Sequence, residues 1–547
     1  MSTFEIKHHI LSELRIIVST FGVENPELKL DESKHRDLGD LSCAIAMSLS
    51  KKLRRPPFEL ANEIKRMINL DKKFCSKITV SNPGFLNFTI SSDYIYNQLS
   101  VITNEGPNYG KKSTYLGQKA QVEFVSANPT GPLTVGHGRQ AVLGDVIARI
   151  LEWHGYEVER EYYYNDAGRQ MKLLGESVKS RYLQIIGENV DLPEGGYEGE
   201  YIKEIAKGII NKKNKTYNRE SSIDDFRKVA EKAIFLEIKN TLNKIQVHFN
   251  NYINEQRFYN EGSIDEVIEK LKEKKFIYEK DGAIWLKTTK FGKIEDTVLV
   301  KSSGEPTYRL PDIAYHRNKL ERGYDLIIDI FGADHNDTYP DILSALNAMG
   351  YDTKNIKVII HQFVSLLRDG KKVKMSTRKA TFVTLDELIK MVGIDVVRYF
   401  FIMRNRQSHL NFDIGLAEKE SDENPVYYLQ YAHARICNIL KHAKDTGVLF
   451  SDSIDISVIV QDEEIDLIKG LMKWPEVMIA ALESLEPQTI ANYLQSIASD
   501  FHRFYSKHRV VTNNKVLTSS RLYLISAVKE ILACGLQVLG ISQPKKM

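Results

Sequence analysis

The sequence predicts an α/β protein: a Rossmann-like domain with a parallel sheet, preceded by a small α+β module and followed by an all-α bundle. Residues 121–166 follow the order buried strand, loop, amphipathic helix, strand, which is typical of a βαβ unit. Residues 1–92 mix helical and strand patterns, and from Val396 onward the apolar residues follow a helical period. A chain of 547 residues is too long for one core, so we expect domains over 1–95, 110–410 and 411–547.

Composition excludes several classes of protein. The net charge is +3, so the whole chain is not a general nucleic-acid binder, although a local basic patch would still suffice for one. The four cysteines lack CxxC or Cys/His metal spacing, which predicts reduced thiols, a cytoplasmic location and no metal site. No apolar run reaches about 18 residues, so no membrane span is expected.

The N-terminal module is predicted from short periodic segments. Helical spacing covers residues 5–21, 41–52 and 57–68. Residues 77–90 alternate like two strands around the Pro83-Gly84 turn. The polar stretch 104–119 then predicts a linker.

The central domain is predicted to begin with a strand over 121–127 and a helix over 139–155, which ends at Gly155. A second strand from Tyr156 should pair parallel to the first. Residues 176–262 predict a helical insertion, and further βα units are expected over 297–360.

The loop between the first strand and helix, residues 128–138, has the sequence NPTGPLTVGHG. A loop that enters a helix directs backbone N–H groups toward the positive end of the helix dipole, which favours phosphate. Gly136 and Gly138 lack Cβ atoms, so a nucleotide can approach closely, and His137 can donate to a phosphate oxygen. Taken alone, a single glycine-rich loop is better explained as a connection with a capping histidine.

A second segment, LLRDGKKVKMSTRKA at 366–380, carries Lys371, Lys372, Lys374, Arg378 and Lys379 around a glycine turn. Thr384 and Glu387 then form a capping-box pattern that predicts the start of a helix. A basic loop anchored to a helix can close over a polyphosphate and stabilise charge on a leaving group. Together the two loops predict nucleotide chemistry.

These two loops resemble the two signatures of class I aminoacyl-tRNA synthetases, and the flanking segments resemble arginyl-tRNA synthetases in order along nearly the whole chain. The matching segments are VEFVSANPTGPLTVGHGRQAVLGD, YYYNDAGRQM, PTYRLPDIAYHRNKL, FGADH, NPVYYLQYAHARI and RLYLISAVKEILACGLQVLGISQPKKM. The resemblance implies ligation of L-arginine to tRNA(Arg), with ATP and Mg²⁺ used and AMP and pyrophosphate released. It also implies a monomer that activates arginine only when tRNA is bound.

The resemblance assigns roles to individual residues. Arginine binding falls to Asn128, Tyr308 and Asp312 with help from Glu123, which suits a guanidinium because that group requires carboxylates. ATP binding falls to Gly136, His137, Gly332, Asp334, His335, Gln362 and Lys374, and the catalytic signatures comprise Thr134, Gly136, His137, Lys374, Met375 and Ser376. Binding of tRNA falls to Asn82, Phe85, Asn87, Tyr427, Tyr431 and Met547.

Two positions depart from the family pattern: Thr134 replaces a signature histidine, and Thr377 replaces a signature lysine. We hypothesise that Arg378 or Lys379 supplies the missing charge. Two alternatives follow. One is a catalytically weak or dead tRNA-binding paralogue, and the other is a synthetase for a different amino acid such as lysine.

Overall fold

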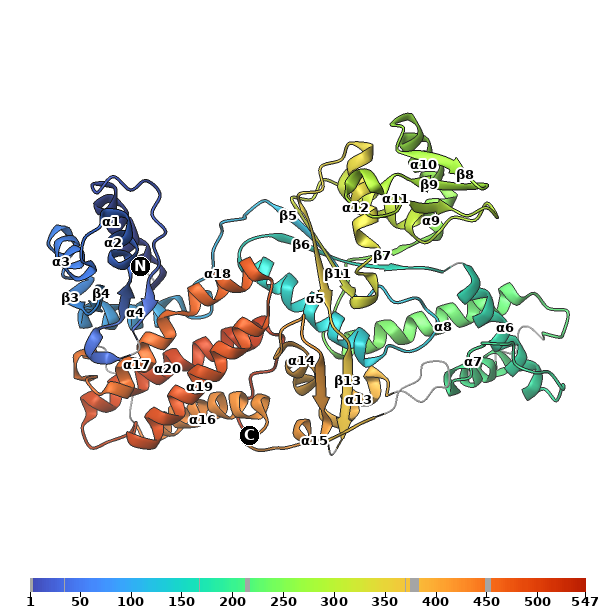
Figure 1. Cartoon of the computed structure of the whole chain (residues 1–547). Helices are drawn as coiled ribbons and strands as arrows, with labels where there is room; N and C mark the ends of the chain where they lie inside the picture. Colours follow the sequence, from blue (N-terminus) through green and yellow to red (C-terminus); the bar gives the residue numbers. More distant parts are fainter. Residues whose placement is uncertain are drawn as a thin grey trace.

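The computed structural model describes residues 3–33, 35–166, 168–211, 217–368, 370–373, 383–447 and 454–547. Figure 1 shows the N-terminal module beside the C-terminal helices at one end of the molecule, with the central sheet between them and the helices α6 to α8. None of the helices in these ranges combines the length and apolar character needed to span a bilayer.

The N-terminal module packs helices on a four-stranded antiparallel sheet of order β1-β2-β4-β3. The predicted hairpin is confirmed as β3 (Cys75–Ser81) and β4 (Phe85–Ile90). The helix predicted over 41–52 is wrong at its start, because Leu41–Cys43 is strand β2 and pairs with β4. The other elements are α1 (Thr3–Ser19), β1 (Asp31–Glu32), α2 (Ile45–Leu53) and α3 (Pro57–Met67), followed by α4 (Ser92–Glu105).

The central sheet is parallel, with the order β12-β11-β5-β6-β7. The predicted βαβ unit is confirmed by β5 (Lys119–Glu123), α5 (Val135–Trp153) and β6 (Glu157–Tyr164). Strand β5 ends before the predicted residue 127, because Val125 and Ser126 take positive φ angles of 69° and 42° and turn the chain out of the sheet.

The segment predicted as a helical insertion contains α6 (Gly168–Ile185), α7 (Glu200–Asn211) and α8 (Ile223–Lys244). It also contains β7 (Asn251–Asn254), which pairs parallel to β6 and forms one edge of the central sheet. The wholly helical interpretation is therefore wrong. A strand of four residues carries too little periodicity to be recognised among helices.

The segment 297–360, predicted as a run of βα units, begins with a strand outside the parallel sheet. β10 (Thr297–Val300) pairs antiparallel with β9 (Ala283–Leu286) in a separate small sheet, so it belongs to no parallel unit. The parallel strands are β11 (Leu326–Gly332) and β12 (Ile356–His361), as predicted. The remaining elements here are β8 (Ile277–Lys280), α9 (Gln256–Asn260), α10 (Ser263–Glu273), α11 (Arg309–Glu321) and α12 (Tyr339–Met349).

After β12 the chain forms a small sheet of order β14-β13-β15 and then helices. β15 (Leu410–Asp413) lies within the region predicted to be helical and pairs parallel with β13 (Val364–Arg368), which corrects that prediction. The other elements are β14 (Lys371–Lys372), α13 (Leu385–Val392), α14 (Ile394–Ile402), α15 (Ile414–Ala417), α16 (Pro425–Asp445), α17 (Asp462–Met472), α18 (Trp474–Ser484), α19 (Gln488–Lys507) and α20 (Lys515–Val538).

A buried arginine joins the sheet domain to the C-terminal helices. Arg398 on α14 is fully buried and pairs with Asp145 of α5 at 2.5 Å. Its guanidinium also donates to the carbonyls of Ile245 and Leu539, at 2.6 and 3.0 Å. Gly540 has a φ of +67°, and a Cβ there would lie 2.1 Å from Arg398 Nη2, so only glycine fits.

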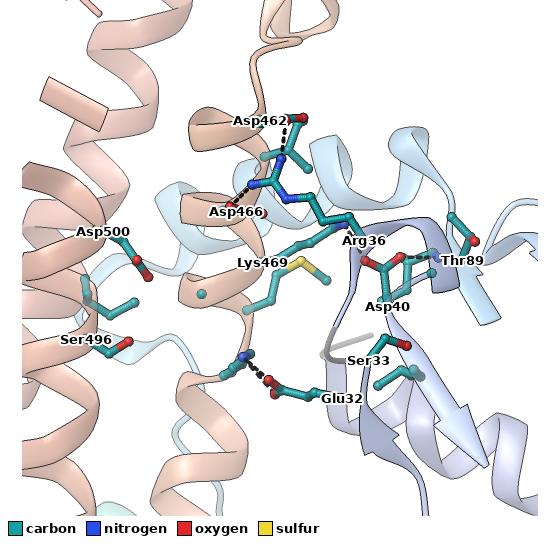
Figure 2. Close-up of a pocket in the computed structure, with 18 of the residues that line it drawn as sticks. Glu32, Ser33, Arg36, Asp40, Thr89, Asp462, Asp466, Lys469, Ser496 and Asp500 are labelled. Carbon is teal, nitrogen blue, oxygen red and sulfur yellow. Dashed lines mark hydrogen bonds and ion pairs between the residues drawn. The ribbon is translucent and has the colours of Figure 1, made fainter. Parts of the chain in front are cut away.

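The N-terminal module contacts α17 through ion pairs around a cavity of about 500 Å³. Figure 2 shows Arg36 directed at Asp462 and Asp466, and Lys469 paired with Asp40. The side chain of Arg36 is half exposed. Exposed pairs of this kind contribute about 0–1 kcal/mol each, so the polar contacts fix orientation more than stability.

Candidate functional site

Strand order reverses between β5 and β11, because the chain continues from β5 to β6 in one direction and from β11 to β12 in the other. In an open parallel sheet, ligands bind outside the carboxyl ends of the strands at such a reversal. The first predicted loop meets this requirement, because it follows β5 and reaches His137, and the segment that carries Asp334 follows β11.

The start of α5 fixes His137. The Thr134 hydroxyl accepts the backbone N–H of His137 at 3.4 Å, and Nδ1 of His137 accepts the backbone N–H of Thr134 at 3.2 Å, forming a capping box. Burial lowers the pKa of His137 to about 4, and Asp334 opposes that shift. The ring is therefore neutral at pH 7, and its remaining proton is on Nε2, which makes that atom a donor. Thr134 acts here as the helix cap.

The two glycines of this loop serve different purposes. A Cβ on Gly136 would meet only Thr134 Oγ1, at 3.6 Å, so the backbone there is open to a ligand. A Cβ on Gly138 would lie 2.6 Å from Leu385 Cδ1 and 2.9 Å from Phe401 Cε2. The prediction that Gly138 makes room for a nucleotide is wrong, since the space is used to pack α5 against α13 and α14.

The loop after β11 is exposed. Asp334 and His335 project from a short 3-10 helix, with the His335 ring stacked on Phe331 at 5.2 Å between centroids. At the end of the neighbouring strand, the backbone of Gln362 accepts from Arg139 Nη1 at 2.8 Å and donates to Arg406 at 2.9 Å. Asp334, His335 and Gln362 therefore follow the carboxyl ends of the adjacent strands β11 and β12.

The structure describes the residues on either side of the second signature but not the signature itself. Lys374, Met375, Ser376, Thr377, Arg378 and Lys379 lie outside the described residues. The predicted capping box is confirmed, with the Thr384 hydroxyl accepting from Glu387 N–H at 3.1 Å. Leu385 N–H donates to the Leu133 carbonyl at 2.8 Å, which attaches the end of this segment to the first loop.

Acidic side chains gather on the other side of the first loop. Glu255 follows β7 and accepts from the Tyr163 hydroxyl at 3.0 Å and from Asn165 Nδ2 at 2.8 Å. Burial raises the pKa of Glu255 to about 7. The pKa of Asp312, in the first turn of α11, is also raised to about 7 by burial, with Glu255 and Glu123 adding to the shift. A site that places such carboxyls together attracts a cation.

Glu123 is held by internal partners. Its carboxylate forms an ion pair with Lys319 and accepts from the Ser126 hydroxyl at 2.8 Å. Lys319 Nζ also lies 2.6 Å from Asp329, and both Lys319 and Asp329 are fully buried. Burial lowers the pKa of Lys319, but Asp329 and Glu123 outweigh it and the net shift is upward. The predicted contact of Glu123 with arginine therefore competes with a built-in cation.

Glu123, His316 and Asp329 are the group in the described residues whose spacing would suit a metal ion. Lys319 occupies the position between two of these ligands, and His316 Nε2 is 3.2 Å from Asp329. The positive charge that these carboxylates require comes from the lysine.

We name Glu255 and Asp312 the acidic pocket. The other predicted arginine residues are each linked to one of them: Asn128 to Glu255 through Asn165, and Tyr308 as the N-cap of the helix that carries Asp312. Asn128 accepts the Asn165 N–H at 2.9 Å and donates to Gln170 at 3.3 Å, which joins the first loop to the end of β6. Tyr308 is exposed at the N-terminus of α11, with Arg309 over its ring. Sequence reasoning missed Glu255 and Lys319. The only signal was an acid directly after an unrecognised strand, and a lysine within a helix looks like any surface lysine.

The predicted tRNA-binding residues of the N-terminal module differ in their exposure to solvent. Asn82 is exposed and Phe85 half-buried at the hairpin tip. Asn87 is 2% exposed, and its amide is satisfied by Ser42 and Ser81, both at 2.9 Å. Its prediction as a base-reading residue is at odds with this burial, because both functional groups already have partners.

The C-terminal candidates are brought together. Tyr427 and Tyr431 both lie on α16, and their rings stack on each other with 6.2 Å between centroids and an interplanar angle of 10°. Arg435 lies over the rings of Tyr431 and Tyr505, at 5.2 and 4.7 Å. Met547 and Tyr431 line one cavity of about 790 Å³, and Met547 and Tyr427 line another of about 560 Å³. Stacked aromatic rings beside a cation suit unpaired bases.

The fold and site match a known class of protein. The family model described as "tRNA synthetases class I (R), catalytic domain" matches residues 98–412, which is more than half of the chain. The model "Arginyl tRNA synthetase N terminal domain" matches residues 5–90, and "DALR anticodon binding domain" matches residues 429–547. The chain belongs to the arginyl-tRNA synthetase family of class I aminoacyl-tRNA synthetases.

Relatives from several organisms agree with this assignment. The chain is 46% identical to the arginine–tRNA ligase of Desulfotalea psychrophila over 516 residues, which covers 94% of each chain. It is 43% identical to that of Salinibacter ruber, covering 99% of this chain and 100% of the relative. The fold matches Thermus thermophilus arginyl-tRNA synthetase with a TM-score of 0.78 at 22% identity, covering 99% of this chain and 100% of that one.

Proposed function

We propose that this chain is an arginine–tRNA ligase, which activates L-arginine with ATP and transfers it to the terminal ribose of tRNA(Arg). The observation that supports this most directly is the acidic pocket of Glu255 and Asp312 beside the loop that carries His137. A guanidinium stays protonated at all physiological pH values, so a pocket of buried carboxyls with raised pKa values selects for it.

In the first step, an oxygen of the arginine carboxylate attacks the α-phosphorus of ATP. The new bond gives arginyl-adenylate, and the bond to the β-phosphate oxygen breaks to release pyrophosphate. The pocket holds the guanidinium through Glu255, Asp312 and Tyr308, while Asn128 positions the amino-acid end. Glu123 contributes its charge and the placement of Ser126. In the second step, a terminal ribose hydroxyl of the tRNA attacks the arginyl carbonyl and AMP leaves.

The nucleotide lies on the β11 and β12 side of the reversal point. Gly136 admits the phosphates to the backbone, and His137 donates from neutral Nε2. Gly332 and Asp334 hold the ribose with His335 nearby, and Gln362 lies at the adenine edge. ATP enters as its Mg²⁺ complex. Lys374, Met375 and Ser376 screen the pyrophosphate, with Arg378 or Lys379 supplying the charge that Thr377 lacks.

The tRNA is bound by the C-terminal helices and by the N-terminal module. Tyr427, Tyr431 and Met547 receive anticodon bases, and Asn82 and Phe85 contact the outer corner of the tRNA. Asn87 supports the hairpin through its serine partners. The domain limits of 1–95, 110–410 and 411–547, a monomeric state and a cytoplasmic location are parts of the same proposal.

The test is aminoacylation with the purified full-length chain. We expect esterification of arginine to tRNA(Arg), and none when lysine replaces arginine or when a tRNA of another specificity is supplied. Binding of tRNA(Arg) without esterification of any amino acid would reject the ligase in favour of the binding paralogue. Charging with lysine would instead show that the pocket has been assigned to the wrong amino acid.

A further inference from the structure

One buried side chain beside the nucleotide loops has an unused hydrogen-bonding atom. His361 is the last residue of β12, is 5% exposed, and pairs in register with Gly332 at the end of β11. Its Nε2 atom is buried, and no donor in the described part of the chain lies within hydrogen-bonding distance. Buried polar atoms in folded proteins nearly always have a partner, so this atom requires an explanation.

The other ring nitrogen determines the chemistry of Nε2. His361 Nδ1 lies 3.3 Å from the carbonyl oxygen of Gln362. A carbonyl can only accept, so Nδ1 carries the proton and Nε2 presents a lone pair. Burial lowers the pKa of His361 to about 4, with Arg139 and His137 adding to the shift, so the ring stays neutral at pH 7. The unused atom is therefore an acceptor that needs an N–H or O–H donor.

The position of this acceptor is fixed by its neighbours. Arg139, two residues after His137, is fully buried and donates to the carbonyls of Gln362 at 2.8 Å, Asn405 at 3.0 Å and Ser408 at 3.1 Å. The Gln362 carbonyl thus accepts from both Arg139 and His361. Gly332, the register partner of His361, is the N-cap of the 3-10 helix that carries Asp334, so His361 lies beside the segment that follows β11.

We propose that His361 is a further nucleotide-binding residue, whose Nε2 accepts a hydrogen bond from a donor group of ATP. The available donors on ATP are the exocyclic amine of adenine and the 2′- and 3′-hydroxyls of the ribose. This inference rests on the proposed function, because it requires ATP at the strand reversal. If His361 only packs against the sheet, replacing it should not change how the enzyme discriminates among nucleotides that differ in these groups.

The test combines removal of the His361 acceptor with removal of single donor groups from ATP. It is measured by arginine-dependent pyrophosphate exchange with tRNA(Arg) present. His361→Phe keeps an aromatic ring and removes the acceptor, and we expect the KM for ATP to rise about tenfold, the effect of one unmade hydrogen bond. The KM for arginine should change less than about twofold. His361→Gln, which retains an acceptor oxygen, should recover part of the loss. His248→Phe, at an exposed histidine, is the matched control.

Wild type and His361→Phe are each assayed with ATP, 2′-deoxyATP, 3′-deoxyATP and the triphosphate of purine riboside, which lacks the amine. For one analogue, the KM of wild type should be about tenfold higher than its KM for ATP. The KM of the variant should be the same for that analogue as for ATP. That pattern supports the proposal and identifies the donor. Additive losses with all three analogues, or an unchanged KM for ATP in the variant, would overturn it.

Thermal melting of each variant shows whether the fold is intact, and His361→Leu provides a second variant without an acceptor if phenylalanine disturbs the packing. Absence of exchange in wild type would count against the proposed function instead. The same comparison would then be run on ATP binding by calorimetry, where loss of coupling still overturns the assignment of His361.

Discussion

The ammonium group of Lys319 forms an ion pair with the carboxylate of Glu123 where neither group is reached by water. The lysine comes from α11, which also carries Asp312, and the glutamate ends β5, from which the first loop departs. The pair therefore fixes the helix that provides one acid of the proposed arginine pocket against the strand that leads to the proposed nucleotide loop. Lys319 acts as a positioning residue in this arrangement.

Removing that lysine should destabilise the protein. Lys319→Met leaves Glu123 and Asp329 buried without their counter-charge, and we expect a loss of about 3–5 kcal/mol in the free energy of unfolding. Denaturant titration followed by intrinsic fluorescence measures it. Lys354→Met, at an exposed lysine, is the control and should change the free energy by less than about 0.5 kcal/mol. Equal stability of the two variants would show that the buried cluster does not need the lysine.

Neutralising the acidic pocket should weaken arginine binding specifically. Asp312→Asn and Glu255→Gln each remove a charged acceptor for the guanidinium while preserving size, and we expect the KM for arginine to rise about 10- to 100-fold. Steady-state kinetics with arginine and ATP varied separately measure this. The KM for ATP should stay within about twofold. Asp265→Asn, at an exposed acid on α10, serves as the control.

A rise in the KM for ATP equal to that for arginine would contradict the separation of the two subsites. No change in the KM for arginine with either substitution would remove the acidic pocket from the site altogether.

Arginine binding should depend on pH near neutrality. The pKa values of Asp312 and Glu255 are raised to about 7 by burial, so both carboxyls gain protons as the pH falls through that value. The guanidinium favours the deprotonated forms, and its binding releases protons. The KM for arginine should therefore rise below pH 7, by up to about tenfold per pH unit for each proton released, and level off above pH 8.

Kinetics between pH 6 and 8.5 test this dependence, with the KM for ATP as the internal reference, since the His137 ring is already neutral over that range. In Asp312→Asn the KM for arginine should depend less steeply on pH. A KM for arginine that is flat across the range would show that the pocket carboxyls are already ionised before arginine binds.

The aromatic stack on α16 should affect tRNA and not the small substrates. Tyr431→Ala removes a ring stacked on Tyr427 and covered by Arg435, and we expect the KM for tRNA(Arg) to rise about 5- to 100-fold, the range measured for single base–aromatic stacks. Tyr431→Phe keeps the ring and should resemble wild type. Aminoacylation at varied tRNA concentration measures both, and equal effects of the two substitutions would attribute the role to the hydroxyl and not to stacking.

Local patterns predicted the elements that bring the site together. The βαβ unit, the hairpin around Pro83 and the Thr384 capping box each depend on neighbouring residues, and all three are present. The acidic pocket was only half predictable, because Asp312 lies in a recognisable segment whereas Glu255 follows a strand of four residues within helices. The pairing of β7 with β6 that brings Glu255 close is a tertiary contact, and periodicity does not encode it.

Burial was the other property that sequence could not supply. Asn87 was assigned to tRNA by the family resemblance and Gly138 to the nucleotide by its lack of a Cβ, but the structure uses the first within the sheet and the second for packing under Leu385. Lys319 and Arg139 look like ordinary helix cations in the sequence. Their roles arise only because the helices place them inside the protein.

The most direct test of arginine activation at this site is the exchange of labelled pyrophosphate into ATP by the purified chain. It is measured with arginine, with and without tRNA(Arg). We expect exchange that requires arginine and appears only when tRNA is present, with Thr134 and Thr377 in place. Absence of exchange under both conditions, from a protein that still binds tRNA(Arg), would contradict the assignment of this site to arginine activation.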